Sequence, residues 1–380
     1  MKIISIGPAY PYRGGIASFT DRLAQQFVNE GHTIEVFTFS LQYPGFLFPG
    51  KTQYTDGPPP KGIKITRLIN TVNPLNWIAT GLKIKKERPD LLLVRYWIPF
   101  MGPCLGTIAR IAKSNKHTAV ICIFDNVVPH EKRTGDEVLT KYFAGNIDGA
   151  IVMANTVLDD LKKFRNDIPV KLSPHPLFDN YGKITGREEA ILKLNLDAGN
   201  SYLLFFGFIR AYKGLDILIK AFSDSRLRNR NIKLIVAGEF YEDSTPYREM
   251  IRSFNLENEI IIYDHFIKDD EVPLFFGAAD LVIQPYKSAT QSGVTQIAYY
   301  FEKPMLVTDV GGLKEIVADG KSGYVVKPEP DQLAESIIDF YNNKRKSIFI
   351  EGVRAGKERF SWDKMTLSIL DVYRKITGKQ

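Results

Sequence analysis

The sequence contains few of the residues that build secreted or metal-binding scaffolds. Its 380 residues include two cysteines, Cys104 and Cys122, and five histidines. Two cysteines cannot form a disulfide framework, and neither stands at the spacing of a zinc ligand. We therefore predict two buried, reduced thiols and no zinc site.

Long apolar runs are also missing. The run at residues 3–6 is too short for the core of a signal peptide. The most apolar long stretch, residues 96–111, contains two prolines and an arginine, whereas a membrane-spanning helix needs roughly 18 apolar residues. These absences predict a cytoplasmic protein that does not cross a membrane.

The remaining composition is that of a globular protein. Hydrophobic residues make up 44% of the chain and charged residues 24%, and the mean hydropathy is −0.14. These values exclude a disordered or fibrous chain. Because domains usually hold roughly 100 to 200 residues, the length predicts two of them.

The net charge of +7 is spread unevenly. Residues 75–117 contain two acids, Glu87 and Asp90, against eight basic residues: Lys83, Lys85, Lys86, Arg88, Arg95, Arg110, Lys113 and Lys116. The same window holds four aromatic residues: Trp77, Tyr96, Trp97 and Phe100. Such a segment suits an anionic membrane face, nucleic acid or a phosphorylated substrate, and it equally suits a solvated helix face.

Short β-rich runs alternate with helical segments along the chain. In the first half we predict a helix at residues 16–30 and strands at 2–7, 33–39, 90–94, 119–124 and 149–153. After a break at residues 173–176 and a polar stretch, the alternation restarts. We predict strands at 202–208, 233–237, 259–263, 281–286 and 305–310, and helices at 213–222, 247–254, 270–278, 293–301 and 332–341. The fold class is therefore α/β, with two doubly wound domains.

Ligands of such sheets bind at the carboxyl ends of the strands, which directs attention to the loops there. Residues 207–214, Gly-Phe-Ile-Arg-Ala-Tyr-Lys-Gly, follow the first strand of the second domain. Arg210 offers a fixed fork of donors and Lys213 a point charge, so this turn suits a phosphate. The alternative is that both are exposed loop charges.

Three further loops contain candidate residues. Residues 289–296 open a helix whose N-terminus favours phosphate, with Gly293 allowing close approach and Ser292 equally able to act as an ordinary N-cap. Gly14 and Gly15 precede the first helix, but they lack a dinucleotide-binding spacing. Residues 125–131 place Asp125, Asn126 and His130 after an apolar strand, where polar groups are catalytic or capping candidates.

Taken together, these segments resemble the family 4 glycosyltransferases of GT-B fold. The motifs that carry the resemblance occur in the family's order: Gly14-Gly15-Ile16-Ala17, residues 207–214, Thr308-Asp309-Val310-Gly311-Gly312-Leu313-Lys314-Glu315, and Phe360-Ser361-Trp362 before an amphipathic helix. The resemblance implies two Rossmann-like domains facing a central cleft. Residues 1–182 would form the acceptor side, joined by a returning helix at 361–380, and residues 183–360 would bind the donor.

The resemblance also implies roles for particular residues. Arg210 and Lys213 would neutralise the donor diphosphate, and the Gly14-Gly15 loop would close over the donor. The other donor-binding candidates are Gly207, Gln291, Ser292, Gly293, Val294, Thr295 and Gln296. Such enzymes are retaining and need no metal, and the chain has no Asp-x-Asp pair of the kind that holds a metal in the other major class.

Two departures from the family pattern stand out. Ala289 and Ile297 occupy the positions of the usual Glu-x7-Glu pair, so Gln291, Thr295 or Gln296 would have to supply the ribose contact. Asp125 stands where the subgroup often has a histidine, which leaves the catalytic group open between Asp125 and His130.

The resemblance predicts transfer of a sugar from a nucleoside diphosphate sugar to a hydroxyl acceptor in surface polysaccharide or glycolipid assembly. The acceptor would be a sugar or a lipid-linked sugar, with no cofactor and no nucleic-acid partner, in the cytoplasm or on the inner face of an anionic membrane. Two alternatives stay open: a nucleotide-sugar 2-epimerase, and a non-catalytic nucleotide-sugar-binding protein of the same fold. A dehydrogenase would need a dinucleotide fingerprint, which neither half offers.

Overall fold

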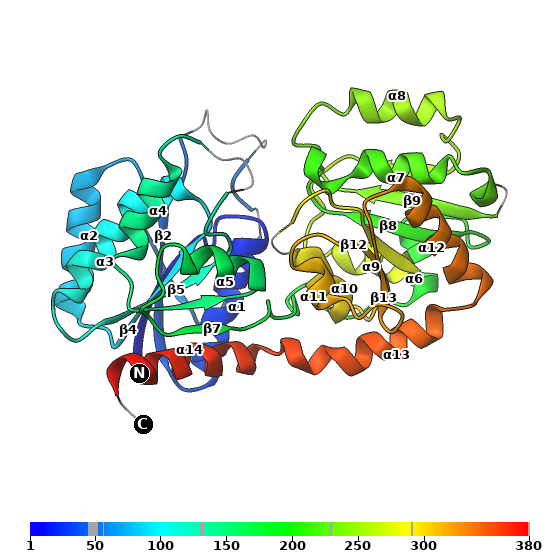
Figure 1. The fold of residues 1–380 in the computed structure, drawn as a ribbon. Helices are drawn as coiled ribbons and strands as arrows, with labels where there is room; N and C mark the ends of the chain where they lie inside the picture. The colour runs from blue at the N-terminus through cyan, green and yellow to red at the C-terminus, as the bar shows by residue number, and fades with distance from the viewer. Residues whose placement is uncertain (45–51, 56, 130–132, 229, 290–291, 379–380) are drawn as a thin grey trace. The chain divides into compact units, whose positions relative to one another are not determined.

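A computed structural model describes residues 1–44, 52–55, 57–129, 133–228, 230–289 and 292–378. The chain divides into two compact units (Figure 1). Unit 1 comprises Met1–Pro176 and Ser361–Gln380, and unit 2 comprises Leu177–Phe360. Within the described ranges, no helix is both long and apolar enough to cross a bilayer.

The boundary between the units lies a few residues before the one expected from the sequence, 182–183. The segment after Pro176 belongs to unit 2 because it bonds there. The amide of Leu177 donates to the carbonyl of Phe360 at 2.9 Å, and the Tyr300 hydroxyl donates to the carbonyl of Gly182 at 2.6 Å. Polar composition suggested a linker, whereas these hydrogen bonds fix the segment to the second unit.

Unit 1 is built on a parallel sheet of seven strands in the order β3-β2-β1-β4-β5-β6-β7. The strands are β1 (Lys2–Ile6), β2 (Thr33–Leu41), β3 (Lys64–Asn70), β4 (Leu91–Tyr96), β5 (Ala119–Phe124), β6 (Gly149–Val152) and β7 (Val170–Leu172). Every residue of β4 and β5 is buried, which explains the apolar runs at 91–94 and 119–124. The sheet is the doubly wound type that the alternation predicted.

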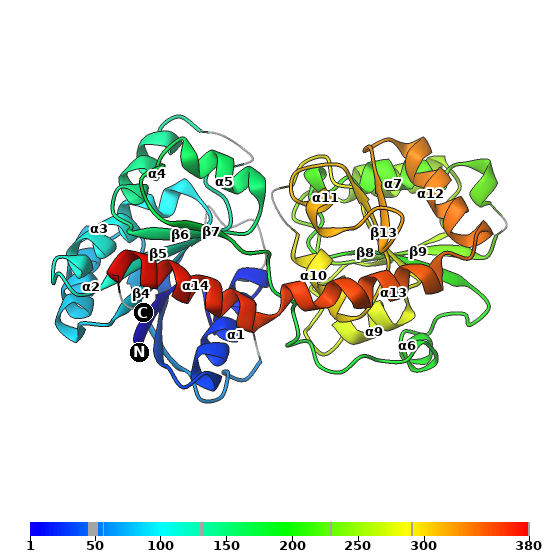
Figure 2. The same cartoon turned by 60° about the horizontal axis from the view of Figure 1, so that its bottom comes forward.

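Helices cover both faces of the unit 1 sheet (Figure 2). One face carries α2 (Pro74–Glu87), α3 (Gly102–Lys113), α4 (Asp136–Ala144) and α5 (Asn155–Lys162), and the other carries α1 (Gly15–Asn29) and α14 (Trp362–Thr377). The last helix packs on the first: the rings of Trp362 and Phe19 lie 5.0 Å apart, and the Thr366 hydroxyl donates to Glu30 at 2.6 Å.

Unit 2 has a parallel sheet of six strands in the order β10-β9-β8-β11-β12-β13. The strands are β8 (Ser201–Phe206), β9 (Ile232–Ala237), β10 (Ile260–Tyr263), β11 (Leu281–Gln284), β12 (Met305–Thr308) and β13 (Gly323–Val326). The helices are α6 (Arg187–Lys193), α7 (Leu215–Phe222), α8 (Thr245–Ser253), α9 (Val272–Ala278), α10 (Gly293–Tyr300), α11 (Leu313–Ile316), α12 (Pro330–Asn342) and α13 (Lys346–Gly356). Figure 2 shows α7 and α12 on one face of the sheet and α9 and α10 on the other.

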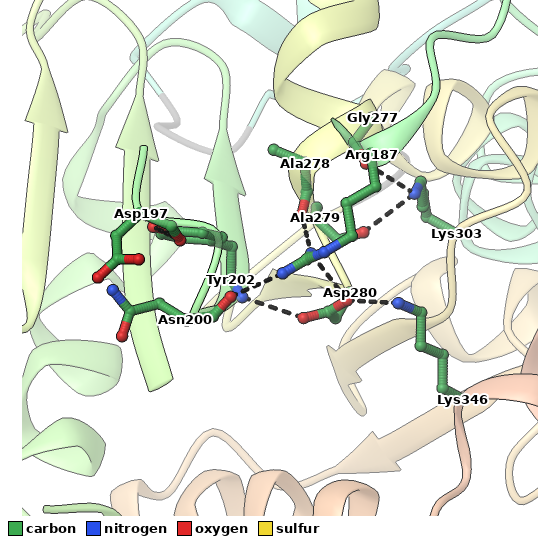
Figure 3. Close-up of polar contacts among 10 residues, drawn as sticks. All are labelled: Arg187, Asp197, Asn200, Tyr202, Gly277, Ala278, Ala279, Asp280, Lys303 and Lys346. Carbon is green, nitrogen blue, oxygen red and sulfur yellow. Dashed lines mark hydrogen bonds and ion pairs between the residues drawn. The ribbon is translucent and has the colours of Figure 1, made fainter. Parts of the chain in front are cut away.

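A buried carboxylate joins several elements at the amino edge of the unit 2 sheet (Figure 3). Asp280 lies directly before β11, and it accepts hydrogen bonds from the Tyr202 amide at 3.0 Å and from Arg187 Nη1 at 3.2 Å. Lys346 at the start of α13 pairs with the same carboxylate. A buried carboxylate with this many donors ties α6, β8 and α13 together.

The cations of this cluster also cap α9. Arg187 donates to the carbonyl of Ala278 at 2.8 Å, and Lys303 donates to the carbonyl of Ala279 at 3.0 Å. Positive charge at a helix C-terminus is favourable because the last carbonyls carry partial negative charge. Burial, reinforced by the neighbouring Lys346, lowers the pKa of Lys303 to about 8. These cations form their hydrogen bonds and ion pairs with carbonyls and a carboxylate of the protein. They lie at the amino edge of the sheet, whereas ligands of such sheets bind at the carboxyl edge.

Candidate functional site

The strand order of the unit 2 sheet reverses at β8, which is the topological switch point of this sheet. The first strand, β8, pairs with β9 on one side and with β11 on the other. The loops that follow β8 and β11 therefore lead away from each other at the carboxyl edge. In open α/β sheets this is where ligands bind. The two loops concerned are loop 207–214 and loop 285–293, of which residues 290–291 lie outside the described residues.

Lys213 is buried at this position, and no acid of the described residues pairs with it. A short 3-10 turn, Ala211–Lys213, directs its side chain inward, and the residue is 8% exposed. Its ammonium lies 5.7 Å from the centre of the Tyr286 ring. Burial, with a smaller effect from the nearby Arg210 charge, lowers the pKa of Lys213 to about 7. A buried cation of this kind is costly unless an anion joins it.

Arg210 stands at the surface beside Lys213. Its guanidinium carbon lies 5.5 Å from the centre of the Tyr241 ring, a cation–π distance that orients the planar fork. Among the described residues, no carboxylate pairs with Arg210 or Lys213. The structure therefore brings the two predicted cations together, one buried and one exposed, with their charges available to a ligand.

The two loops are fastened to each other by backbone contacts. The amide of Lys287 donates to the carbonyl of Tyr212 at 2.7 Å. Gly214 has a φ of 71°, and a Cβ there would lie 1.9 Å from the carbonyl oxygen of Pro285. The Thr308 hydroxyl at the end of β12 donates to the carbonyl of Tyr286 at 2.6 Å, which anchors loop 285–293 to the sheet. The position of the Lys213 ammonium is thus set by the protein in advance of any ligand, which is the condition for electrostatic catalysis.

Gly207 lies close to both Lys213 and the first turn of α10. A Cβ on Gly207 would lie 3.1 Å from Lys213 Nζ and 3.6 Å from Val294 Cγ2 in the first turn of α10. Its φ of 95° is one that side chains rarely adopt. The ammonium of Lys213 and the N-terminus of α10 therefore share one neighbourhood.

The residues at the start of α10 mainly cap and pack the helix within unit 2. The Ser292 hydroxyl accepts from the Val294 amide at 3.2 Å, which is the ordinary N-cap considered from the sequence. A Cβ on Gly293 would lie 2.9 Å from the Phe178 ring, so packing requires this glycine. A donor would meet the backbone N–H groups and dipole of this helix rather than the Ser292 hydroxyl.

Thr295 and Gln296 do not reach the surface of unit 2. Both are buried, and the Thr295 hydroxyl donates to the carbonyl of Ser292. Neither side chain is exposed in this structure, and the expectation that one of them replaces the missing glutamate stays a prediction. The third candidate for that contact, Gln291, lies outside the described residues. The amide atoms of Gln296 have no hydrogen-bond partner among the described residues, and neither do those of Gln284 at the end of β11.

In unit 1, the Gly14-Gly15 loop begins α1. Gly14 has a φ of 100° and occupies the N-cap position, where it forms no side-chain cap, and the first turn contains no acid. The N-terminal amides of α1 are thus left without a capping side chain, and the dipole there is positive. The structure explains Gly14 by its backbone conformation, while Gly15 is an exposed first residue of the helix.

Asp125 is held by a buried arginine. Its carboxylate forms a two-point ion pair with Arg95, with distances of 2.7 Å to Nε and 2.5 Å to Nη2. The Arg95 guanidinium also lies 3.6 Å from the centre of the Phe19 ring. A carboxylate engaged in this way orients Arg95, and the choice of Asp125 as the catalytic group stays a prediction. The other candidate, His130, lies outside the described residues.

Known proteins show what this chain is similar to. Residues 186–354 match the model of the family described as Glycosyl transferases group 1. An uncharacterized glycosyltransferase of Methanocaldococcus jannaschii is 25% identical, over 99% of this chain and 99% of its own. The O-antigen chain mannosyltransferase C of Escherichia coli is 24% identical, over 95% of this chain and 94% of its own. Residues 186–354 of this chain therefore form a group 1 glycosyltransferase domain, and these relatives extend the similarity over nearly the whole chain.

Solved structures give the same fold for the glycosyltransferase. HepE of Anabaena in complex with UDP has a TM-score of 0.75 at 16% identity, covering 99% of this chain and 100% of its own. The lipopolysaccharide outer core galactosyltransferase WaaB has a TM-score of 0.71 at 13% identity, covering 98% and 99%. The fold is GT-B, as the resemblance predicted. The family match spans loop 207–214 and loop 285–293 of the glycosyltransferase.

Two acids, Glu239 after β9 and Asp21 in α1, were not among the candidates expected from the sequence. Glu239 is buried at the second position after the end of β9, and its carbonyl accepts from the Ile209 amide at 2.9 Å. Asp21 in α1 accepts from the Tyr10 amide at 3.3 Å, and burial raises its pKa to about 7. An acid directly after an apolar strand was a usable signal for Glu239. Asp21 sits on a helix and is recognisable only from its burial.

Proposed function

We propose that this glycosyltransferase transfers a sugar from a nucleoside diphosphate sugar to a hydroxyl acceptor, with retention of configuration and without a metal ion. The observation that carries the proposal is the buried ammonium of Lys213 at the switch point of the unit 2 sheet, with which no carboxylate of the described residues pairs. An incoming diphosphate supplies the negative charge that this ammonium lacks. A relative in the fold comparison, HepE, was solved with UDP, which is a ligand of the proposed kind.

Lys213 and Arg210 would act on the leaving group. As the bond from the anomeric carbon to the β-phosphate oxygen breaks, negative charge grows on the diphosphate, and the two cations stabilise it. The acceptor oxygen forms its bond to the anomeric carbon on the same face. The acceptor proton passes to the departing phosphate oxygen, so no protein nucleophile is required. Fixed cations and the α10 dipole take the part that a metal ion would otherwise play.

We propose a sugar or lipid-linked sugar as the acceptor, in surface polysaccharide or glycolipid assembly on the cytoplasmic side of an anionic membrane. Two relatives support this choice by their names, an O-antigen chain mannosyltransferase and a lipopolysaccharide outer core galactosyltransferase. The basic character of residues 75–117 also suits an anionic surface.

A panel of nucleotides tests the donor site through thermal stability. Nucleoside diphosphates with different bases, and their sugars, are added at about a hundredfold excess over Kd. The matching one should raise the melting temperature of unit 2 by about 5–10 °C, because a ligand that binds only the folded state stabilises it by roughly 2.7 kcal/mol at that excess. The free nucleoside should give a much smaller shift, since the cations recognise phosphate.

The variant Lys213→Met should lose most of this shift, and Lys220→Met serves as the matched control. Lys220 is an exposed lysine on α7 in the same unit. A nucleoside that stabilises the protein as much as its diphosphate, or an undiminished shift in Lys213→Met, would contradict the proposed site. A shift with diphosphate sugars but no transfer or hydrolysis would point to a binding protein.

A further inference from the structure

Helix α2 of unit 1 exposes aliphatic side chains along one face. Leu75 is 77% exposed, Ile78 43% and Leu82 52%. Their spacing of three and four residues places them on one side of the helix, and the exposed Ala79 lies between them. We call these four residues the α2 face. A monomeric protein rarely exposes clustered leucines without a partner surface.

Capping and packing on its other side hold α2 in place, so its aliphatic side chains stay exposed. The Asn73 side chain caps the N-terminus by accepting from the Leu75 amide at 3.0 Å. Trp77 Nε1 donates to the carbonyl of Asn70 at 2.8 Å, and the opposite side of the helix is buried through Thr80, Gly81 and Ile84. The α2 face is therefore held outward by capping and packing on the other side.

Close packing on α3 leaves the helix no freedom to rotate the leucines inward. A Cβ on Gly81 would lie 2.8 Å from the Cβ of Ile111 on α3, so the two helices are in near contact. Figures 1 and 2 both show α2 and α3 side by side within unit 1. Turning the α2 face inward would require this contact to be broken.

Lysines border the α2 face. Lys83 and Lys85 lie on opposite sides of the apolar stripe by helical spacing, and Lys86 continues it at the C-terminal end. The one acid of the helix, Glu87, pairs with Lys2 at 3.4 Å. Among the described residues, no acid pairs with any of the three lysines. Apolar residues flanked by lysines are typical of helices that lie in a bilayer surface, where long lysine side chains reach the headgroups.

The aromatic residues expected at this surface are packed elsewhere. Tyr96 is fully buried, and Trp77, Trp97 and Phe100 pack against the core of unit 1. The apolar component of the basic segment is therefore aliphatic. Nucleic acid would be met by cations with aromatic rings for base stacking. A solvated helix face carries single exposed leucines, such as Leu192 on α6, rather than a stripe of aliphatic side chains.

We propose that the α2 face binds the surface of an anionic lipid bilayer. The leucines and the isoleucine enter the boundary between headgroups and acyl chains, and Lys83, Lys85 and Lys86 bind anionic headgroups. The inference deepens the proposed function and rests on it in one respect, since a lipid-linked acceptor has to be met at a bilayer. Its physical basis, the exposed aliphatic stripe with flanking lysines, is independent of the donor site.

Sedimentation with lipid vesicles tests the proposal. The full chain should sediment with vesicles that contain phosphatidylglycerol and phosphatidylcholine, and much less with phosphatidylcholine alone. The double variant Leu75→Asn and Leu82→Asn should weaken binding on the order of a hundredfold, because two leucines no longer leave water. Replacing Lys83 and Lys86 by glutamine should weaken binding by about fivefold per lysine and reduce its dependence on salt.

The matched control is Leu192→Asn. Leu192 is 80% exposed on α6 of unit 2, so the substitution removes an equally exposed leucine outside the α2 face. This variant should sediment like the parent. All variants should keep the parent's melting temperature, because the altered side chains are at the surface.

Three results would overturn the proposal. The parent does not sediment with phosphatidylglycerol vesicles, or the leucine double variant sediments as well as the parent, or the parent forms a dimer in solution that the double variant abolishes. The last result would assign the α2 face to a second copy of the chain. Nucleotide-induced stabilisation is measured on the same variants. If nucleotides do not stabilise the parent, the donor site alone is contradicted. If nucleotides stabilise the parent but it does not bind vesicles, only the membrane inference is contradicted.

Discussion

Lys213→Met should lower the turnover of donor by about 10²–10³-fold and leave the protein at least as stable as the parent. The loss follows from removing a fixed charge that acts on the leaving diphosphate. The stability follows from the depressed pKa: the folded state binds this proton less tightly than the unfolded chain does. Below about pH 7 the buried ammonium opposes folding, and the penalty fades as pH rises toward the ordinary lysine pKa. Methionine has a similar shape and removes that penalty.

The measurement combines steady-state transfer or donor hydrolysis with thermal melting. Arg210→Ala should also lose activity, by a smaller factor because its guanidinium is exposed and screened by solvent. Lys220→Met should behave as the parent in both assays. Unchanged turnover in Lys213→Met would show that the ammonium does not act on the donor, and a large fall in melting temperature would show that it is structural.

Gly214→Ala should destabilise unit 2 by about 2–5 kcal/mol and abolish nucleotide binding. The added Cβ would lie 1.9 Å from the Pro285 carbonyl oxygen, and the φ of 71° disfavours any side chain. Relieving the clash has to move loop 207–214 away from loop 285–293, and Lys213 moves with it. Denaturant unfolding and nucleotide titration measure the two effects.

Gly320→Ala separates backbone strain from the clash. Gly320 has a φ of 69° in the same unit, and nothing lies within 4 Å of the Cβ position. This variant carries the strain of a left-handed residue alone, about 1 kcal/mol. Equal destabilisation of the two variants would mean that the contact between Gly214 and Pro285 contributes nothing to joining the loops.

The alternation of strands and helices was sufficient to predict both parallel sheets and the edge strand β10, but not the other three edge strands. β3 and β7 in unit 1 and β13 in unit 2 were absent from the prediction. Each has a single neighbouring strand, and much of its surface is exposed, as in β3 with alternating polar residues and β7 with three residues. Edge strands need less apolar sequence, so periodicity alone distinguishes them poorly from loops.

The sequence predicted the site residues whose position in a loop after a strand was informative. It did not predict the features that depend on a contact between distant parts of the chain. Arg210 and Lys213 stood out because they follow a strand and precede a helix. The burial of Lys213 beside Tyr286 depends on a loop far along the chain. The pairing of Asp125 with Arg95 joins the ends of neighbouring strands and likewise leaves no trace in the local sequence. Local pattern located the phosphate-binding candidates, whereas charge pairing needed the folded sheet.

Proton uptake on nucleoside diphosphate binding tests the central claim most directly. At pH 8, Lys213 with its pKa of about 7 is mostly neutral, whereas a bound diphosphate raises that pKa and fully protonates it. Calorimetry in buffers of different ionisation enthalpy should therefore show uptake of roughly 0.5–0.9 proton per ligand. Lys213→Arg, charged in both states, should bind with no such uptake. The account is contradicted if the parent takes up no proton, or if Lys213→Arg takes up as much as the parent.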